Sequence, residues 1–354
     1  MTLLTALTWE FAKLETGLSG GNQSVRPHRR RSLRKPWVCI LSLSLLASSI
    51  ASGQEKPQST SSRGQGKKRK AAAASKPYVL VGAGDIASCK DLSGAEATAE
   101  LIDKIPGEVF AAGDLAYEKG TAAEFANCYD RTWGRFKSRT HPAPGNHEFY
   151  GSKDGSPYFH YWGAQAGPPE KGYYSFDLGV WHVIALNTNC AAPGLGGCDQ
   201  GSPQDLWLRQ DLAAHANSCI VAFGHHALYS SGIFKNHAIH PELRQFWQDL
   251  YAAHADLVLN GHEHSYERFA PQDPNANLDR KNGIREIVVG TGGRSHDPLG
   301  FPVANSEVRN STSFGVLKLT LWPGKYSWEF VPIDAKNGFH DAGRGTCHNV
   351  KPQN

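Results

Sequence analysis

The stretch Leu259-Asn260-Gly261-His262-Glu263-His264 follows a short apolar run that begins at Ala255. That run has the length and composition of a buried β-strand, and Gly261 supplies the backbone freedom for a sharp turn at its end. Side chains two residues apart on an extended segment share a face, so His262 and His264 can point toward one centre. Neutral imidazole is the commonest metal ligand in proteins. The pattern therefore indicates a metal site, with a solvated loop after a strand as the alternative.

Four further loops offer oxygen or nitrogen ligands, and each also follows a strand-like apolar run. These loops are Gly84-Asp85, Gly113-Asp114, Gly145-Asn146-His147-Glu148 and Gly224-His225. A single aspartate after a glycine is commonly a turn or cap residue, so either Gly-Asp pair is uninformative alone. Because ligands of α/β sheets lie beyond the carboxyl ends of the strands, we expect the five loops to meet at one place.

The order of the apolar runs predicts the fold class. Strand patterns alternate with helical patterns up to the central motif, and mainly strand patterns follow it. Helical spacing covers 95–105, 121–136, 202–215 and 241–253. This order predicts an α/β domain of two packed sheets flanked by helices, and the span 78–354 is long enough for a sizeable core.

Residues 1–53 have the organisation of a secretory signal. A basic segment precedes an apolar run from Trp37 to Ala51, and small residues follow to Gly53. The stretch Arg30-Arg31-Ser32-Leu33-Arg34-Lys35 also fits a twin-arginine pattern. We expect a secreted, periplasmic or cell-surface protein. An uncleaved anchor is the alternative, although this run of 15 residues holds four serines and is short for a spanning helix. Because the signal features begin only near Arg26, the true start codon is left open.

The segment 54–77 is rich in Ser, Gln, Lys and Ala and contains the run Lys67-Lys68-Arg69-Lys70. Its composition predicts a disordered, basic linker. The formal net charge of +4 includes the basic leader and this linker, so the folded part is near neutral and no nucleic-acid partner is expected. We expect no stable membrane span after signal cleavage, because no later stretch is apolar enough.

Seven cysteines occur, and Cys39 lies in the leader. The other six are Cys89, Cys128, Cys190, Cys198, Cys219 and Cys347. An even number after a secretion signal favours disulfides, although six reduced thiols are the alternative. Cys190 and Cys198 bracket a Gly-Pro-rich loop and are the pair expected first. Pairing Cys89 with Cys128 and Cys219 with Cys347 is the working assignment for the rest.

In chain order, the five strand-end loops resemble the calcineurin-like metallophosphoesterase superfamily over nearly the whole domain. Three further features resemble its purple acid phosphatase branch: Tyr117 placed three residues after Asp114, the segment His225-His226-Ala227-Leu228-Tyr229, and Tyr266-Glu267-Arg268. The resemblance implies a four-layer sandwich of two mixed β-sheets flanked by helices. It also implies a binuclear metal site at the C-terminal ends of the strands.

The resemblance implies the ligands position by position. One metal would be held by Asp85, Asp114, Tyr117 and His264, and the second by Asp114, Asn146, His225 and His262. A bridging carboxylate brings two cations to about 3.5–4 Å, where they clamp the attacking and leaving oxygens of phosphoryl transfer. Phenolate is a hard donor suited to Fe(III). The expected cofactors are therefore two metal ions, Fe(III) and a divalent zinc, iron or manganese ion.

Two positions depart from the family pattern. Ala87 stands where many members have a histidine two residues after the first aspartate, and Tyr117 would replace that ligand. Ala227 stands where proline is usual in the branch, which we expect to affect only the turn.

His147 directly follows a ligand and would face the substrate, as the corresponding family histidine does. Protonated, it can bind a phosphate oxygen and give the leaving alkoxide its proton; a structural histidine is the alternative. His237 is a second candidate for a phosphate contact, or a plain surface histidine. Three histidines are pocket candidates without an assigned role: His160, His226 and His296. The segment 290–293 predicts a tight turn beneath the metals or, alternatively, a phosphate cradle.

The resemblance implies a secreted phosphomonoesterase in which a hydroxide held by the metals attacks a small-molecule phosphate ester. One alternative is a phosphodiesterase that uses the same metal site. Another is a non-catalytic, surface-associated binding protein with a vestigial site. Intact ligand types at all seven positions argue against the latter.

Overall fold

The computed structural model describes residues 76–233 and 240–350. The chain divides into two compact units, and the second, Lys70–Asn354, contains all described residues. Three parts of the chain that the sequence singled out lie outside the described residues: the predicted leader, nearly all of the predicted linker, and His237. Within the described ranges, no helix combines the length and apolar character needed to cross a bilayer.

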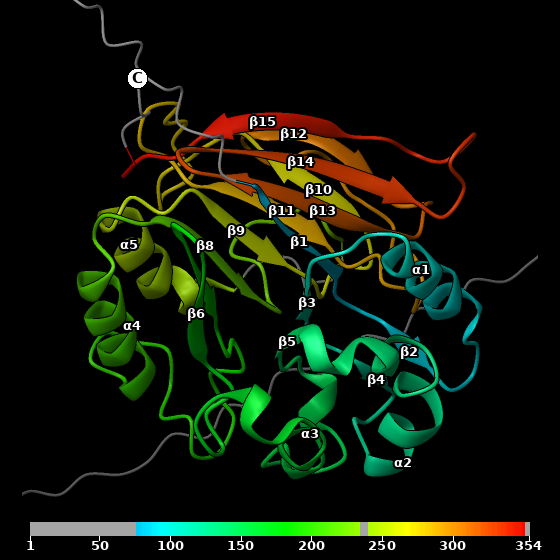
Figure 1. The fold of residues 1–354 in the computed structure, drawn as a ribbon. Helices are drawn as coiled ribbons and strands as arrows, with labels where there is room; N and C mark the ends of the chain where they lie inside the picture. Colours follow the sequence, from blue (N-terminus) through cyan, green and yellow to red (C-terminus); the bar gives the residue numbers. More distant parts are fainter. Residues whose placement is uncertain (1–75, 234–239, 351–354) are drawn as a thin grey trace, which may run out of the picture. The chain divides into compact units, whose positions relative to one another are not determined.

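Two mixed β-sheets form the centre of the second unit (Figure 1). In the order of its neighbours, the first sheet contains β15 (Ala342–Thr346), β14 (Lys325–Pro332), β13 (Gly315–Trp322), β1 (Tyr78–Ala83), β3 (Glu108–Ala112) and β5 (Thr140–Ala143). The second contains β12 (Ser306–Asn310), β10 (Tyr266–Phe269), β11 (Arg285–Val289), β9 (Leu257–Asn260), β8 (Cys219–Gly224), β7 (Trp181–Ala185) and β6 (Tyr174–Leu178).

Adjacent parallel strands form one block in each sheet, at the β5 end of the first sheet and in the interior of the second. In the first sheet β1, β3 and β5 run parallel, and in the second β7, β8, β9 and β11 do so. A short parallel pair, β2 (Ala87–Ser88) with β4 (Ala116–Tyr117), continues beyond β1 and β3. Parallel strands end at the same edge, so the loops after them are brought together.

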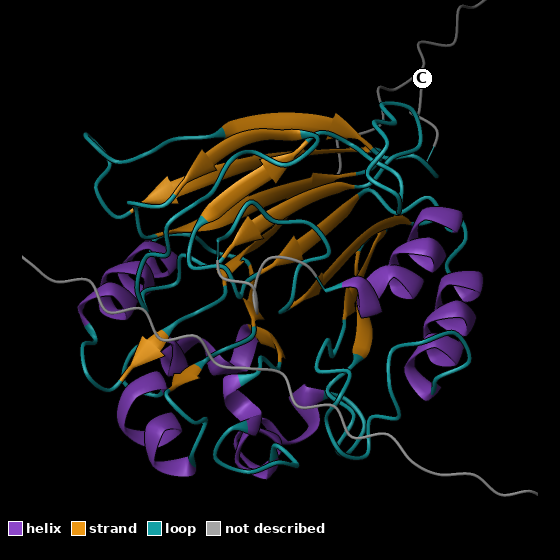
Figure 2. Cartoon of the chain, turned by 180° about the vertical axis from the view of Figure 1, so that it is seen from behind, coloured by secondary structure: helices purple, strands orange, loops and turns teal. Residues whose placement is uncertain are grey.

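Helices flank the lower part of the sheets in the view of Figure 2, and the strands at the top of that view have no helix over them. The α-helices are α1 (Ser93–Asp103), α2 (Ala122–Glu124), α3 (Ser156–Trp162), α4 (Pro203–Ala214) and α5 (Arg244–Ala252). Short 3-10 or π turns are η1 (Phe125–Tyr129), η2 (Trp133–Arg139), η3 (His147–Phe149), η4 (Gly163–Ala166) and η5 (Pro241–Leu243). The helix predicted over 121–136 is therefore wrong as a single helix, because α2, η1 and η2 share that span.

The alternation of side chains along β8 shows how the layers are held together. Val221 and Phe223 face the core between the sheets, where the Phe223 ring lies 5.9 Å from that of Phe110 on β3. Ile220 and Ala222 face the other way, into a second core formed with α4 and α5. Neighbouring residues of a strand point to opposite faces, so a strand buried on both faces is continuously apolar. The predicted sandwich of two mixed sheets flanked by helices is confirmed.

Three disulfides join the pairs that the sequence analysis expected. They are Cys89–Cys128, Cys190–Cys198 and Cys219–Cys347. The third links the start of β8 to the segment after β15, across 128 residues of sequence. The second closes a short loop between β7 and α4, across 8 residues.

Candidate metal centre

The five strand-end loops lie where strand ends of the first sheet adjoin strand ends of the second. Gly84, after β1, donates its N–H to the carbonyl of Val289 on β11 at 3.0 Å, which joins the two sheets. A Cβ atom on Gly84 would lie 2.9 Å from the Cα of Gly261 and 2.7 Å from the carbonyl oxygen of Ala112. Only glycine allows the loops after β1, β3 and β9 to approach this closely.

Three residues of these loops have backbone angles that side-chain-bearing residues seldom adopt. The φ angles are 61° at Asp85, 52° at Asp114 and 72° at His262. Such left-handed conformations are uncommon outside glycine, and strained residues concentrate at functional sites. The expectation that Gly261 makes the sharp turn was wrong, because the positive φ belongs to His262 and Gly261 serves the close approach.

The first set of donor atoms surrounds the Tyr117 hydroxyl. This oxygen lies 2.7 Å from Asp85 Oδ1, 3.0 Å from Asp114 Oδ2 and 3.1 Å from His264 Nε2. The His264 Nε2 atom is also 3.3 Å from Asp85 Oδ1. All four residues of the first expected ligand set therefore bring a donor atom to one small volume.

The second set surrounds Nε2 of His225. This nitrogen lies 2.9 Å from Asn146 Oδ1, 3.2 Å from Asp114 Oδ2 and 3.1 Å from His262 Nδ1. Asp114 Oδ2 is thus adjacent to both sets. Because two ring nitrogens and two oxygens converge on one point, a single shared proton cannot serve all of these contacts.

The donor chemistry fits the expected pair of ions. The two sets combine carboxylate, phenol, amide and imidazole donors, which suit iron, zinc or manganese. Burial, and then the carboxylates of Asp114 and Asp85, raise the pKa of the Tyr117 phenol well above its ordinary value. Burial also lowers the pKa of His225, but Asp114 outweighs it and raises that pKa to about 9. A phenolate and neutral imidazoles here would therefore need a compensating cation.

The buried Glu148 holds the Asp114 loop in place. Its carboxylate accepts backbone N–H groups of Gly145 at 2.7 Å and of Asp114 and Leu115 at 2.9 Å each. The N–H of His147 also donates to Asp114 Oδ1 at 2.8 Å. The loops after β3 and β5 are therefore connected both by the Glu148 carboxylate and by the Asp114 carboxylate. Sequence reasoning assigned Glu148 no role, and its place in Gly-Asn-His-Glu was the available signal.

The segment after β11 supports the Tyr117 side of the centre. The Ser295 hydroxyl lies 2.6 Å from Nδ1 of His264, which orients that ring. The Arg294 guanidinium lies 5.0 Å from the centre of the Tyr117 ring and donates to Glu118 at 2.6 Å. The N–H of Gly292 is bonded to the carbonyl of Gly84 at 2.9 Å. The segment 290–293 thus packs beneath the centre, and this amide is not free to cradle a phosphate.

A family model described as calcineurin-like phosphoesterase matches residues 67–266, which is more than half of the 354-residue chain. The chain belongs to this family. Purple acid phosphatase 15 of Arabidopsis thaliana is 29% identical over 233 residues, covering 54% of this chain and 41% of that protein. The uncharacterized protein Rv2577 of Mycobacterium tuberculosis is 30% identical over 238 residues, covering 55% of this chain and 44% of that protein. The matched part is less than half of these curated relatives.

Solved structures show the same fold at low sequence identity. The purple acid phosphatase PPD1 from yellow lupin seeds superposes with a TM-score of 0.62 at 22% identity, covering 79% of this chain and 57% of that chain. GAP50, the anchor in the inner membrane complex of Plasmodium, superposes with a TM-score of 0.58 at 16% identity, covering 78% and 90%. The resemblance to the purple acid phosphatase branch of the calcineurin-like family is confirmed.

His147 stands at the rim of this calcineurin-like centre. Its Nδ1 donates to the carbonyl of Glu118 at 2.7 Å, and its Nε2 lies 3.7 Å from Asp114 Oδ2. Its ring centre is 4.3 Å from that of Tyr117. The bond at Nδ1 fixes the ring, so that Nε2 is directed to the centre.

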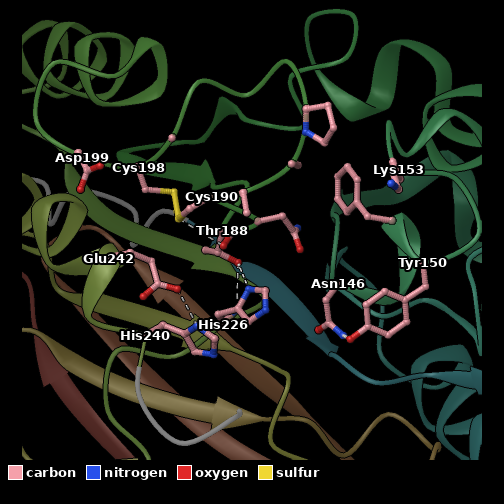
Figure 3. Close-up of a pocket in the computed structure, with 16 residues that line it drawn as sticks. Asn146, Tyr150, Lys153, Thr188, Cys190, Cys198, Asp199, His226, His240 and Glu242 are labelled. Atoms are coloured by element: carbon pink, nitrogen blue, oxygen red, sulfur yellow. Dashed lines mark hydrogen bonds and ion pairs between the residues drawn. A yellow bond between two sulfur atoms is a disulfide. The ribbon is translucent and has the colours of Figure 1, made fainter. Parts of the chain in front are cut away.

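Two more histidines adjoin the second donor set, at one end of a cavity of about 680 Å³ (Figure 3). His226 Nδ1 lies 2.8 Å from the Thr188 hydroxyl, and His240 Nδ1 lies 3.0 Å from a Glu242 carboxylate oxygen. The two ring centres are 4.3 Å apart, and that of His226 is 4.4 Å from that of His262. Sequence reasoning missed His240, because nothing in its local sequence distinguishes it from His237.

The other two pocket histidines lie elsewhere. The exposed His160 lies on α3, where its Nδ1 bonds the Ser156 carbonyl at 3.1 Å, and it lines a different cavity. His296 stacks on Phe314 with ring centres 4.0 Å apart, and burial, followed by the charge of His264, lowers its pKa. His160, a pocket candidate without an assigned role, thus lines a cavity other than the one beside the second donor set.

Proposed function

We propose that this protein is a binuclear, metal-dependent phosphoesterase that hydrolyses small-molecule phosphate monoesters. The observation that carries the proposal is the pair of donor sets that share Asp114, in a member of a phosphoesterase family. The Tyr117 set suits Fe(III), since phenolate is a hard donor, and the set with the neutral Asn146 amide suits a divalent zinc, iron or manganese ion.

When bound, the two ions would supply an activated water and offset the charge that develops on the phosphoryl oxygens. Asp114 would keep the two ion positions adjacent, and Glu148 would keep Asp114 in place. His147 would act on the leaving group. With Nδ1 bonded to Glu118, a protonated ring has its second N–H at Nε2 and can give that proton to the departing alkoxide.

His226 and His240 support a preference for monoesters. Both rings lie next to His262, and each is oriented at Nδ1, by Thr188 and by Glu242 respectively. Together with His147 they could contact several non-bridging phosphate oxygens. A monoester dianion offers three such oxygens with two charges, whereas a diester offers two with one charge, so the monoester gains more from these donors.

The three disulfides support a location outside the reducing cytosol, in a secreted, periplasmic or cell-surface setting. We propose that residues 1–53 direct export and that residues 54–77 form a linker to the domain 78–354. Amino-terminal sequencing of the exported protein tests this division, with a mature terminus near residue 54 as the expected result. Retention of residues 1–53 would contradict it.

The activity itself is tested with p-nitrophenyl phosphate and bis(p-nitrophenyl) phosphate, which share one leaving group. Metal-loaded protein is expected to have the larger kcat/KM on the monoester. A larger value on the diester would establish the phosphodiesterase alternative. Absence of turnover on both, with both ions bound, would favour a binding protein.

A further inference from the structure

The cavity beside the second donor set is far larger than a phosphate group. Its volume is about 680 Å³, which is within the range of sites that enclose whole small-molecule ligands. Asn146, His226 and His240 line its inner end (Figure 3). A phosphate held at the centre would therefore have its alcohol portion in this cavity.

One wall is formed by Tyr150, whose ring is held although its side chain is exposed. The residue is 62% exposed, but its hydroxyl accepts a hydrogen bond from Asn146 Nδ2 at 2.8 Å. Its ring centre also lies 4.6 Å from that of His147. A planar aromatic surface is thus fixed directly beside the proposed position of the phosphate.

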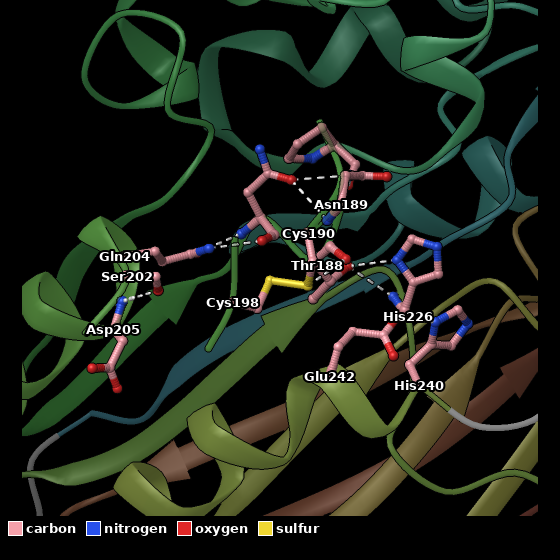
Figure 4. Close-up of a disulfide and its surroundings, with 12 residues drawn as sticks. Thr188, Asn189, Cys190, Cys198, Ser202, Gln204, Asp205, His226, His240 and Glu242 are labelled. Atoms are coloured by element: carbon pink, nitrogen blue, oxygen red, sulfur yellow. Dashed lines mark hydrogen bonds and ion pairs between the residues drawn. A yellow bond between two sulfur atoms is a disulfide. The ribbon is translucent and has the colours of Figure 1, made fainter. Parts of the chain in front are cut away.

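The opposite wall is the loop closed by the Cys190–Cys198 disulfide (Figures 3 and 4). This wall presents Ala191, Ala192 and Pro193 and the disulfide itself, and is largely apolar. Two contacts hold its base: the Asn189 amide donates to the Pro144 carbonyl at 3.1 Å, and Thr188 bonds His226. An apolar wall facing an aromatic ring favours a flat, uncharged group between them.

The charges of the lining agree with an uncharged group. Lys153 and Asp199 contribute one charge of each sign, and the Glu242 carboxylate lies 3.0 Å from His240 Nδ1. The lining therefore offers no excess of charge to a charged leaving group.

Building on the phosphoesterase function proposed above, we propose that this cavity is a leaving-group site for alcohols that carry a planar aromatic group, such as nucleosides. Tyr150 is its specificity-determining residue, because the aromatic group stacks on the Tyr150 ring while the phosphate lies at the centre. Stacking tolerates different aromatic rings, so the site favours any leaving group with a planar aromatic ring and does not distinguish one base from another.

The test compares adenosine 5′-monophosphate with ribose 5-phosphate. In both substrates the bond hydrolysed is the phosphate ester of the primary 5-hydroxyl of ribose, and only the nucleotide carries an aromatic base. Wild-type protein is expected to show about a tenfold larger kcat/KM on the nucleotide, the order of one good stacking contact. Tyr150→Ala should bring this ratio to near one. Tyr150→Phe, which keeps the ring, should retain the ratio, even if loss of the bond to Asn146 slows both substrates.

Tyr78→Ala is the matched control, because it removes a tyrosine that is 48% exposed at the start of β1. It should leave the ratio unchanged. A wild-type ratio near one, or a high ratio that survives Tyr150→Ala, would overturn the proposal while leaving the phosphoesterase function intact. If neither ester is hydrolysed by protein with both ions bound, the phosphoesterase function fails, and this inference fails with it.

Discussion

Two clusters of histidines and carboxylates in this protein differ in how their polar atoms are matched. In the metal centre, three other donor atoms lie within 3.2 Å of His225 Nε2. On β7, His182 has one carboxylate for each nitrogen: Nδ1 lies 2.8 Å from Asp177, and Nε2 lies 2.7 Å from Asp211. The His182 ring also stacks on that of His215, with centres 3.6 Å apart.

The difference supports the proposal that the first cluster is a ligand set and the second an ion pair. A charged imidazole has two N–H donors, and at His182 each donor has its own acceptor, so that cluster is complete without a further group. Around His225 and Tyr117, several acceptors compete for few protons, and a cation would satisfy them all. The backbone differs too, since His182 lies in a regular strand while Asp85, Asp114 and His262 have positive φ angles.

The largest effect that distinguishes the clusters is on catalysis. Asp114→Asn should lower kcat/KM on p-nitrophenyl phosphate by several orders of magnitude, because both ions depend on this carboxylate. Asp211→Asn, the matched change at His182, should leave kcat/KM within about twofold of wild type, since Asp211 lies in the other cluster. Steady-state kinetics on both variants measure the two effects. Comparable losses of kcat/KM in both variants would contradict the distinction between a catalytic cluster at Asp114 and a structural cluster at His182.

The next effect concerns His147. His147→Asn should slow turnover by about 10² to 10⁴-fold on alkyl phosphates and much less on p-nitrophenyl phosphate, whose leaving group does not need the proton. His215→Asn is the control and should change neither rate. Equal losses on good and poor leaving groups would speak against proton donation by His147.

The His182 cluster should instead show its effect in stability. Asp211→Asn leaves the buried His182 with one carboxylate, and we expect the free energy of unfolding to fall by roughly 1.5–3 kcal/mol, the value of a hydrogen bond to a charged group. Urea denaturation at pH 6 measures it. An unchanged midpoint would mean that these hydrogen bonds contribute nothing to the fold.

The smallest effect is the pH dependence of that stability. Burial lowers the pKa of His182, but the hydrogen bonds to Asp211 and Asp177 outweigh burial and raise it. The stabilisation is therefore fully present below the unfolded pKa near 6.5 and is lost as pH rises through the folded pKa. His182→Gln should remove this part of the slope above about pH 6.5. An identical slope in both proteins would contradict the assignment.

Local sequence was enough to predict which loops form the candidate site, because five of the seven expected ligands directly follow a glycine at the end of an apolar run. Asp85, Asp114 and His225 follow this pattern directly. The supporting contacts were not predictable, since they join distant segments: the N–H of His262 donates to Asp85 Oδ2 across 177 residues at 2.7 Å. Ser295 was missed for the same reason. A serine hydroxyl has no local pattern that marks a histidine partner.

The fold was predictable to the level of layers but less so in its short elements. The helix expected over 202–215 is α4, and the Ser202 hydroxyl accepts the N–H of Asp205 at 3.3 Å at its start. The irregular turns between Thr121 and Arg139 were not expected, because helical spacing does not distinguish an α-helix from successive π and 3-10 turns. The conformation of Gly261 was misjudged because glycine in a sequence signals either an unusual φ angle or a close approach.

Metal analysis of purified, metal-loaded protein tests the central claim most directly. The account predicts two ions per chain in wild type and in Asp211→Asn, and at most one in Asp114→Asn, which has lost the carboxylate shared by both donor sets. Protein loaded with iron in air should also absorb visible light, and Tyr117→Phe should lose that absorption while keeping much of its metal. Two ions retained in Asp114→Asn with normal turnover would contradict the shared-carboxylate centre.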